Sequence, residues 1–319
     1  MEWLRFAEGI IKGENWAPTP LLPAATLSHK LGVDLWFKRE DCTPIGSFKF
    51  RGALVCMDKL GDRLSDKGVY VASAGNYGIA IAEAGRRFGI PVNVVVPENA
   101  TPSKKDRIRL CGANLIVHGD DFDDSKQFAR DLSTKHGGSF WEDGVVKEMS
   151  HGAGTIASEI LEQDPNWDVV LVPLGNGSLI KGIASVIKKT NPDTKIIGLV
   201  PSGSPAMYEA FKDMFVYGSA ESLTYADGLG VRIPISDITE EIKTLVDDVW
   251  LVEEENLLPA VNTLIRLEQI ITEPSAAICI AALVENIEGL SGKKVAAIIT
   301  GSLLNMGMLQ SILEMDTLV

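Results

Sequence analysis

Short apolar runs rich in β-branched residues alternate with amphipathic stretches along most of this chain. Seven runs have the length and composition of buried strands: 68–72, 91–96, 113–117, 169–172, 195–200, 249–252 and 295–300. Five stretches place apolar residues at spacings of three and four, as helices do: 79–88, 104–110, 125–133, 155–162 and 257–267. The alternation predicts strand–helix–strand units, and hence an α/β fold with largely parallel sheets flanked by helices.

The length of the chain predicts two lobes rather than one. A chain of 319 residues exceeds the usual size of a single core. No Pro- or Ser-rich linker and no repeat divides it, so we expect a discontinuous arrangement. A large lobe would comprise 1–67 and 147–319, and a smaller lobe, 68–146, would be inserted into it. Ligands of such folds bind at the carboxyl ends of the strands, so we expect the site in the cleft between the lobes.

Charge and composition favour a small-molecule partner. The net charge of −13 argues against nucleic acid or an anionic membrane as partner, because no basic stripe is available for phosphates. The four cysteines and four histidines show no metal spacing, so we expect the cysteines to be reduced thiols. The first residues lack the pattern of a secretory signal, and no apolar run is long enough to span a bilayer. We expect a soluble, cytoplasmic protein.

The segment Ser47-Phe48-Lys49-Phe50-Arg51-Gly52 places a lysine where a strand gives way to a helix. Two phenylalanines flank Lys49, and partial desolvation by them would favour the neutral amine that Schiff-base chemistry needs. The alternative is an ordinary surface lysine whose stem lies along apolar neighbours. This segment alone does not decide between the two.

A second candidate segment, Ser73-Ala74-Gly75-Asn76-Tyr77-Gly78, joins an expected strand to an expected helix. Small residues there expose backbone N–H groups at a helix N-terminus, which suits a carboxylate or another anion. Asn76 adds a neutral donor. Ordinary helix capping by the same residues is the competing interpretation.

A third segment, 173–182, also connects a strand to a helix and contains Gly175-Asn176-Gly177-Ser178-Leu179. Its glycines allow a phosphate to approach main-chain donors, and Ser178 adds a hydroxyl. The Gly-Lys-Ser/Thr ending of a nucleotide P-loop is missing, so a nucleoside triphosphate is disfavoured. Gly-rich turns between a strand and a helix are widespread, so the loop alone is only weakly specific, and a phosphate ester is compatible with it.

The last expected strand delivers Thr300-Gly301-Ser302 into a turn. The hydroxyl of Thr300 could satisfy a backbone group, as buried hydroxyls usually do, or it could hydrogen-bond a heterocyclic nitrogen. An amine, a carboxylate cradle, a phosphate cradle and this hydroxyl together fit pyridoxal 5'-phosphate.

Several motifs, in order, give the chain a resemblance to fold-type II pyridoxal-phosphate enzymes of the threonine/serine dehydratase (ammonia-lyase) group. The similarity runs nearly end to end. It rests on 19–21, 38–41, 46–53, 73–78, 175–179, 226–228, 273–275 and 300–301. The resemblance implies a two-lobed fold like that of the tryptophan synthase β subunit, and a homodimer.

The resemblance also implies roles for individual residues. Lys49 would form the Schiff base and act as the catalytic residue, Phe48 would pack against the ring, and Asn76 would bind its 3'-oxygen. The phosphate would be bound by Gly175, Asn176, Gly177, Ser178 and Leu179, and Thr300 would meet the pyridine nitrogen. The substrate would be bound by Ser73, Ala74, Gly75, Asn76, Tyr77, Gly228 and Glu273.

The chain also departs from the family pattern. Tyr77 stands where the family usually has histidine, and Ala74 stands where serine racemases have a second acid/base, so racemisation is disfavoured. The loop 175–179 and Thr300 are closer to threonine synthase-like proteins. Val200 lies where some relatives carry a cation-binding glutamate, which puts a divalent-metal site in doubt, so we expect no essential metal.

The reaction expected from these residues is β-elimination from a β-hydroxy amino acid such as threonine, serine or 3-hydroxyaspartate, giving a 2-oxo acid and ammonia. Two alternatives remain open. One is a β- or γ-replacement enzyme, including a threonine synthase-like one, and the other is a non-catalytic metabolite-binding protein.

Overall fold

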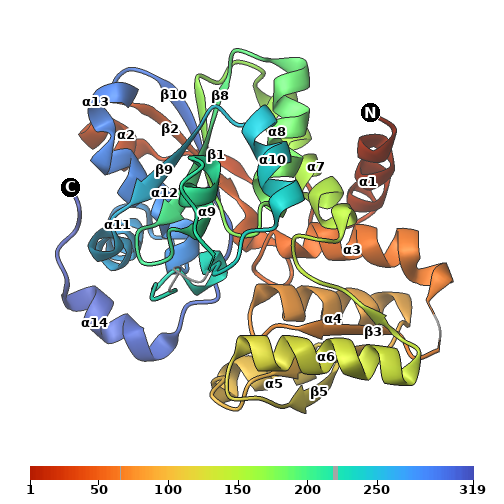
Figure 1. Cartoon of the computed structure of the whole chain (residues 1–319). Coiled ribbons are helices and arrows are strands. Elements are labelled where there is room, and N and C mark those ends of the chain that lie inside the picture. Colours follow the sequence, from red (N-terminus) through yellow and green to blue (C-terminus); the bar gives the residue numbers. More distant parts are fainter. Residues whose placement is uncertain (65, 218–221) are drawn as a thin grey trace.

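The computed structural model describes residues 1–64, 66–217 and 222–319, and these residues form two β-sheets with helices around them (Figure 1). The larger sheet has the order β1-β2-β10-β7-β8-β9. Its strands are β1 (Leu21–Pro23), β2 (Asp34–Arg39), β10 (Lys294–Ile299), β7 (Val169–Pro173), β8 (Lys195–Pro201) and β9 (Asp248–Val252). All neighbours are parallel except β1, which runs antiparallel to β2.

The smaller sheet is wholly parallel in its described strands and has the order β5-β4-β3-β6. These strands are β5 (Asn114–Val117), β4 (Val92–Val96), β3 (Val69–Ala72) and β6 (Ser139–Phe140). They lie below the larger sheet in Figure 1 and form a separate layer with α4, α5 and α6. All four strands fall between residues 68 and 146, while the exact limits of the two lobes stay a prediction.

The expected α/β class is confirmed, and each of the seven expected strands is present with ends that differ by at most one residue. Their Val- and Ile-rich composition explains this agreement, because strands covered on both faces are apolar throughout. The strands β1, β2 and β6 were not among the seven expected runs. The two or three residues of β6 and β1 are too few to carry a periodicity.

The helices are α1 (Glu2–Lys12), α2 (Ala25–Leu31), α3 (Lys49–Leu60), α4 (Asn76–Phe88), α5 (Pro102–Leu110), α6 (Phe122–His136), α7 (Lys147–Gln163), α8 (Ser178–Thr190), α9 (Ala206–Phe211), α10 (Ser236–Leu245), α11 (Leu257–Glu268), α12 (Pro274–Glu285), α13 (Ile287–Leu290) and α14 (Leu309–Glu314). All five expected helices are among them. Four of these begin earlier than the apolar spacing indicates. The largest difference is in α7, which starts eight residues before the expected Thr155.

Close packing between α7 and α3 explains why the apolar pattern does not show the first eight residues of α7. Its first half contains Gly152, and a Cβ at that position would collide with the backbone of Gly52 in α3. The two helices therefore cross at a pair of glycines. Because small residues at such a crossing interrupt the apolar pattern, the spacing of large side chains does not reveal this part of the helix.

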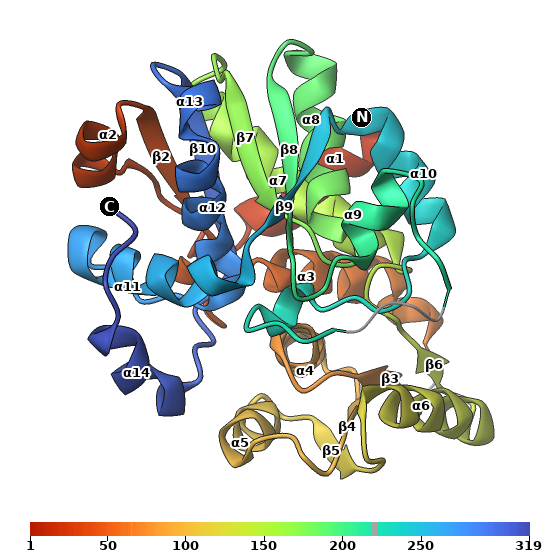
Figure 2. The same cartoon turned by 60° about the vertical axis from the view of Figure 1, so that its left-hand side comes forward.

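Alternate residues of the larger sheet enter two separate cores. Leu171, Leu199 and Ala297 face the core that α11 and α12 cover, whereas Val170 and Ile298 face the core made with α7 and α8. Figure 2 shows these helices on opposite faces of the sheet. The helix α3 contributes to a third core, with β3, β4 and α4. Because α3 follows β2 and precedes β3 in the chain, it connects the two sheets.

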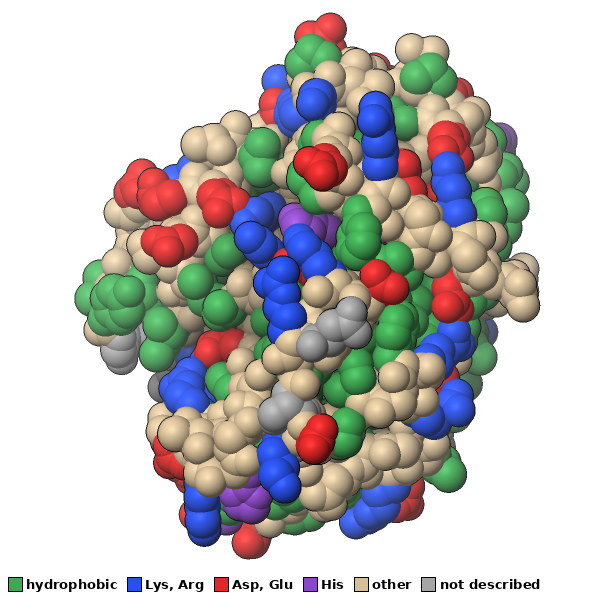
Figure 3. Space-filling model, turned by 90° about the vertical axis from the view of Figure 1, so that its right-hand side faces the viewer, with side chains coloured by type: hydrophobic (Ala, Val, Ile, Leu, Met, Phe, Trp, Pro, Cys, Tyr) green, Lys and Arg blue, Asp and Glu red, His purple; other side chains and the backbone are tan. Residues whose placement is uncertain are grey.

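The described surface carries both signs of charge. Acidic and basic side chains are interspersed over the face shown in Figure 3. In the described ranges, no helix combines the length and the apolar character that crossing a bilayer requires.

Candidate active site

Most of the residues expected to form the site lie on segments that follow the carboxyl ends of parallel strands. The turn 73–75 follows β3, the segment 174–177 follows β7, and Thr300 follows β10. Helices begin directly after the first two segments, at Asn76 and Ser178. These segments therefore lie at the carboxyl ends of the strands, while the site itself stays a prediction.

The segment that carries Lys49 is fixed to the end of β10. The Phe48 amide donates to the Thr300 carbonyl (3.0 Å), and Ser47 forms an antiparallel bridge with Gly301. Lys49 is the first residue of α3. The helix starts where the sequence indicates, but no strand leads directly into it, because β2 ends at Arg39 and a 3-10 helix (Glu40–Cys42) and turns lie between. Backbone hydrogen bonds to the end of β10 therefore set the place of Lys49.

The side chain of Lys49 is 14% exposed, and its amine nitrogen has aromatic and acidic neighbours. The nitrogen lies 5.1 Å from the centre of the Phe48 ring and 5.8 Å from that of Tyr77. It also donates to both carboxylate oxygens of Asp143, at 2.8 and 2.6 Å. Asp143 is not among the residues that the sequence indicates, because no spacing connects a residue between β6 and α7 to Lys49.

Two residues after Lys49, the fully buried Arg51 anchors α3 from within. Its guanidinium contacts Glu40 (2.7 Å) and Glu159 (2.7 Å). Lys38 pairs with the same Glu159 and donates to the Thr19 carbonyl (2.8 Å). This cluster joins β2, α3 and α7 behind the site. The carboxylates compensate its buried positive charge.

The turn after β3 is compact and leads directly into α4. The Gly75 amide donates to the Ser73 hydroxyl (3.2 Å), and a Cβ at Gly78 would collide with the Ser73 carbonyl. Ala74 packs against the core beside α4. Tyr77 is 5% exposed, and its hydroxyl is buried without a hydrogen-bond partner in the structure. Burial raises the pKa of Tyr77 well above the usual value of a phenol, so its hydroxyl stays protonated.

Asn76 and Glu273 meet across the two sheets. The Asn76 amide nitrogen lies 2.9 and 3.0 Å from the two carboxylate oxygens of Glu273, and the Leu303 amide donates to the same carboxylate (3.0 Å). Burial raises the pKa of Glu273 to about 7, although the Asn76 and Leu303 hydrogen bonds oppose that shift. Asn76 Oδ1 is buried and has no partner.

The glycine-containing loop after β7 packs tightly against its neighbours. Gly177 has φ +91°, in the left-handed region, and a Cβ there would lie 2.6 Å from the Ile242 side chain. Gly175 faces the Gly228 carbonyl closely, since its Cβ would lie 3.0 Å from that oxygen. Ser178 is 3% exposed at the start of α8. The loop thus presents a helix N-terminus, where backbone N–H groups and the helix dipole favour an anion.

The remaining expected residues complete the same region. The Gly228 amide donates to the Ser275 hydroxyl (3.1 Å) at the start of α12. Its neighbour Asp227 pairs with Lys104 of α5 at 2.6 Å. Leu179 and Thr300 are each 4% exposed.

These residues fit pyridoxal phosphate. Tyr77 and Asn76 each leave a polar atom buried without a partner, and buried polar atoms are normally hydrogen-bonded. A polar ligand at the start of α4 would supply the missing hydrogen-bond partners of the Tyr77 hydroxyl and of Asn76 Oδ1. The start of α8 suits a phosphate, and Lys49 supplies the amine.

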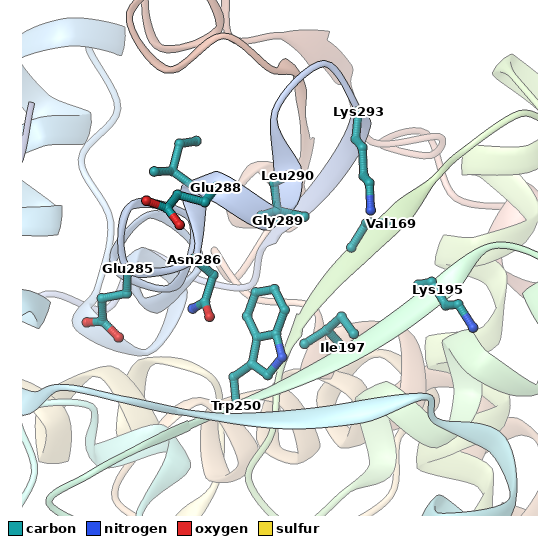
Figure 4. A pocket seen from close by; sticks show the side chains of 11 residues that line it. Val169, Lys195, Ile197, Trp250, Glu285, Asn286, Glu288, Gly289, Leu290 and Lys293 are labelled. Atoms are coloured by element: carbon teal, nitrogen blue, oxygen red, sulfur yellow. The ribbon is translucent and has the colours of Figure 1, made fainter.

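A separate pocket of about 490 Å³ lies near the amino ends of β7 and β8, and it shares no residue with the expected site. Trp250 stands between Glu285 and Glu288 on one side and Lys195 and Lys293 on the other (Figure 4). Although this pocket is large, none of the residues expected to take part in the chemistry of Lys49 lines it.

Comparison with known proteins identifies the class. Residues 14–301 match the model of the family described as "Pyridoxal-phosphate dependent enzyme". The chain belongs to this family of pyridoxal-phosphate-dependent enzymes.

Individual relatives give a more specific similarity than the family as a whole. The chain is 34% identical to the L-threonine ammonia-lyase of Thermotoga maritima over 301 residues, which cover 93% of this chain and 74% of that protein. Its structure resembles the processed threonine deaminase isoform 2 of Solanum lycopersicum, with TM-score 0.91, 30% identity and coverage of 98% and 92%. It also resembles maize serine racemase, with TM-score 0.88, 28% identity and coverage of 98% and 96%. The expected fold type and cofactor are confirmed.

Proposed function

We propose that this protein is a pyridoxal-phosphate-dependent ammonia-lyase that acts on a β-hydroxy amino acid such as threonine or serine. The α C–H bond and the β C–O bond break and water leaves; the resulting enamine becomes an imine, which water hydrolyses to a 2-oxo acid and ammonia. The names of the relatives bear out this class of reaction. The observation that carries the proposal is the amine of Lys49, held between two aromatic rings near the segment that follows β10.

Lys49 would hold the cofactor as a Schiff base, and Phe48 would pack beside its ring. The N-terminus of α8, with Gly175, Asn176, Gly177, Ser178 and Leu179, would bind the phosphate. Asn76 would contact the 3'-oxygen of the ring, and Thr300 would meet the pyridine nitrogen. When bound, the cofactor supplies an electron sink for the pair left by the α-proton.

The residues of the chain would divide the remaining tasks. The segment Ser73-Ala74-Gly75-Asn76-Tyr77 would hold the substrate carboxylate at the start of α4, with backbone N–H groups that follow Ser73, because the Ser73 amide itself donates to the Val95 carbonyl. The amine of Lys49 would take the α-proton and hold it. Glu273 and Gly228 would border the substrate. Because Ala74 offers no acid or base on the other face, we propose elimination rather than racemisation.

Purified protein supplied with pyridoxal phosphate tests the proposal. Incubation with threonine, serine and 3-hydroxyaspartate should yield 2-oxo acid and ammonia, and Lys49→Ala should abolish both the product and the visible absorbance of the bound cofactor. Lys12→Ala, which removes an exposed side chain of α1, is the control that should retain both.

Two outcomes would select the alternatives. Incorporation of an added thiol or amine without oxo acid would indicate a replacement enzyme. Absence of cofactor absorbance in the wild-type protein would favour a non-catalytic binding protein. The homodimer, the cytoplasmic location, the absence of nucleic-acid partners and the independence from metal stay predictions.

A further inference from the structure

Asp143 is a largely buried carboxylate that a fixed loop holds in the site. It lies between β6 and α7, and its side chain is 21% exposed. Before it, the Trp141 amide donates to the Tyr70 carbonyl of β3 (2.9 Å). Around it, the Val145 amide donates to the Glu142 carbonyl (3.2 Å). Backbone hydrogen bonds on both sides therefore set the position of this carboxylate.

The partner of this carboxylate is the amine of Lys49. The nitrogen donates to both carboxylate oxygens of Asp143, at 2.8 and 2.6 Å. Its other neighbours are the rings of Phe48 and Tyr77, which carry no charge. In the described part of the chain, Asp143 is the only ionic partner of this nitrogen.

The proposed reaction uses the amine of Lys49 twice. It first holds the cofactor. After the amine of the substrate has taken its place, it is released and takes the α-proton. The released amine is the end of a flexible four-carbon stem with many rotamers. A group of the fold must therefore hold it beside the α-carbon if proton transfer is to be fast.

Proton transfer also creates a positive charge where little water is present. The α-proton moves to Nζ of Lys49, the electron pair of the C–H bond stays with the substrate and the cofactor, and the amine becomes an ammonium group. Because the side chain of Lys49 is only 14% exposed, contact with a carboxylate replaces part of the lost hydration. Asp143 keeps its charge and takes no proton. The proton on the nitrogen equals the one that the departing hydroxyl needs to become water.

We propose that Asp143 is a positioning residue for Lys49 in this reaction. It holds the released amine beside the α-carbon, and it stabilises the ammonium group that forms when this amine takes the α-proton. The inference rests on the proposed function and adds a second residue to its step at the α-carbon. Removing the charge of Asp143 therefore slows the loss of the α-proton more than it weakens the binding of substrate or cofactor.

Chemical modification of the cofactor-free protein tests the pair itself. Acetic anhydride reacts with a neutral amine and not with an ammonium group, and mass spectrometry of peptides measures its reaction with Lys49. Asp143→Asn keeps the shape of the side chain and removes the charge that stabilises the ammonium form. Lys49 should then react at least about tenfold faster at neutral pH, which corresponds to about 1.4 kcal/mol of lost charge stabilisation.

Exchange of the α-hydrogen of alanine tests the proposed step. Alanine has no leaving group on its β-carbon, so the holoenzyme in deuterium oxide can exchange its α-hydrogen without elimination, and NMR measures the rate. Asp143→Asn should slow this exchange at least about tenfold, with unchanged cofactor absorbance and nearly the same KM for alanine. Asp143→Glu, which keeps the charge, should slow it less.

A neighbouring carboxylate provides the matched control. Glu142 pairs with Arg130 of α6 (3.0 Å), so Glu142→Gln should change neither the modification of Lys49 nor the exchange rate. Equal modification in the wild type and Asp143→Asn, equal exchange rates in these two proteins, or the same changes in Glu142→Gln would overturn the inference. Slower exchange in Asp143→Asn, with no 2-oxo acid from threonine or serine in the wild type, would refute the proposed function alone.

Discussion

Asn76 donates to both carboxylate oxygens of Glu273, at 2.9 and 3.0 Å, and so joins the first residue of α4 to the residue that precedes α12. The two residues belong to segments 197 positions apart in the sequence. Burial raises the pKa of Glu273 to about 7. This carboxyl group is therefore only partly ionised at neutral pH.

The raised pKa predicts a pH-dependent stability. Between the ordinary value of 4.5 and about 7, the unfolded chain loses the Glu273 proton while the folded protein keeps it. The free energy of unfolding of the cofactor-free protein should then fall by up to about 1.4 kcal/mol per pH unit over this window, as pH rises. Denaturant titrations at several pH values measure this slope.

Glu273→Gln identifies the source of that slope. Glutamine keeps an oxygen for the Asn76 amide and cannot ionise, so the variant should have a shallower dependence between pH 4.5 and 7 than the wild type. An unchanged slope in the variant would show that another group is responsible.

Replacing Arg51 should destabilise the protein strongly. Arg51→Met leaves the buried Glu40 and the nearly buried Glu159 with Lys38 as their remaining cationic neighbour. Breaking such a cluster from one side typically costs about 3–5 kcal/mol. Lys12→Ala removes an exposed ion pair and should cost less than about 1 kcal/mol, so similar losses in the two variants would contradict this account.

Gly177→Ala should weaken cofactor binding. The left-handed φ of +91° costs a residue with a side chain about 1–2 kcal/mol, and the new Cβ would meet Ile242 and Ile238 at 2.6 and 2.7 Å. The loop must shift, which moves the donors proposed for the phosphate. Titration of the apoprotein with pyridoxal phosphate should give a higher Kd, while Gly9→Ala, whose Cβ meets no atom within 4 Å, should leave Kd unchanged.

Tyr77→Phe should weaken substrate binding and leave the stability of the protein nearly unchanged. The buried hydroxyl has no partner in the structure, so its removal should change the free energy of unfolding of the cofactor-free protein by less than about 1 kcal/mol. If the hydroxyl meets the substrate, KM for threonine should rise severalfold at unchanged cofactor absorbance. A large loss of stability would mean that the hydroxyl has a structural role instead.

The sequence predicts most of the fold because its strands are continuous apolar runs, as in β7 and β10. It predicts less where close packing of small residues interrupts the apolar pattern. The first half of α7 cannot be predicted from the spacing of apolar residues. Gly152 and Gly52 allow α7 and α3 to cross closely, and glycines do not contribute to an apolar pattern. The strands β1 and β6 are too short to be recognised.

For the site, the sequence locates segments but not partners. Ser73, Gly177 and Thr300 lie where strands end, which can be inferred from chain order and the parallel sheet. The pairs Lys49–Asp143 and Asn76–Glu273 cannot be inferred in this way, since they depend on how the two sheets are placed relative to each other. Asp143 is therefore a residue that only the structure identifies.

The most direct test of the central claim is to locate the cofactor on the chain. Borohydride reduction of the holoenzyme, followed by proteolysis and mass spectrometry, should find the phosphopyridoxyl group on Lys49. A label on another lysine, or no label on a protein that binds pyridoxal phosphate, would contradict the account.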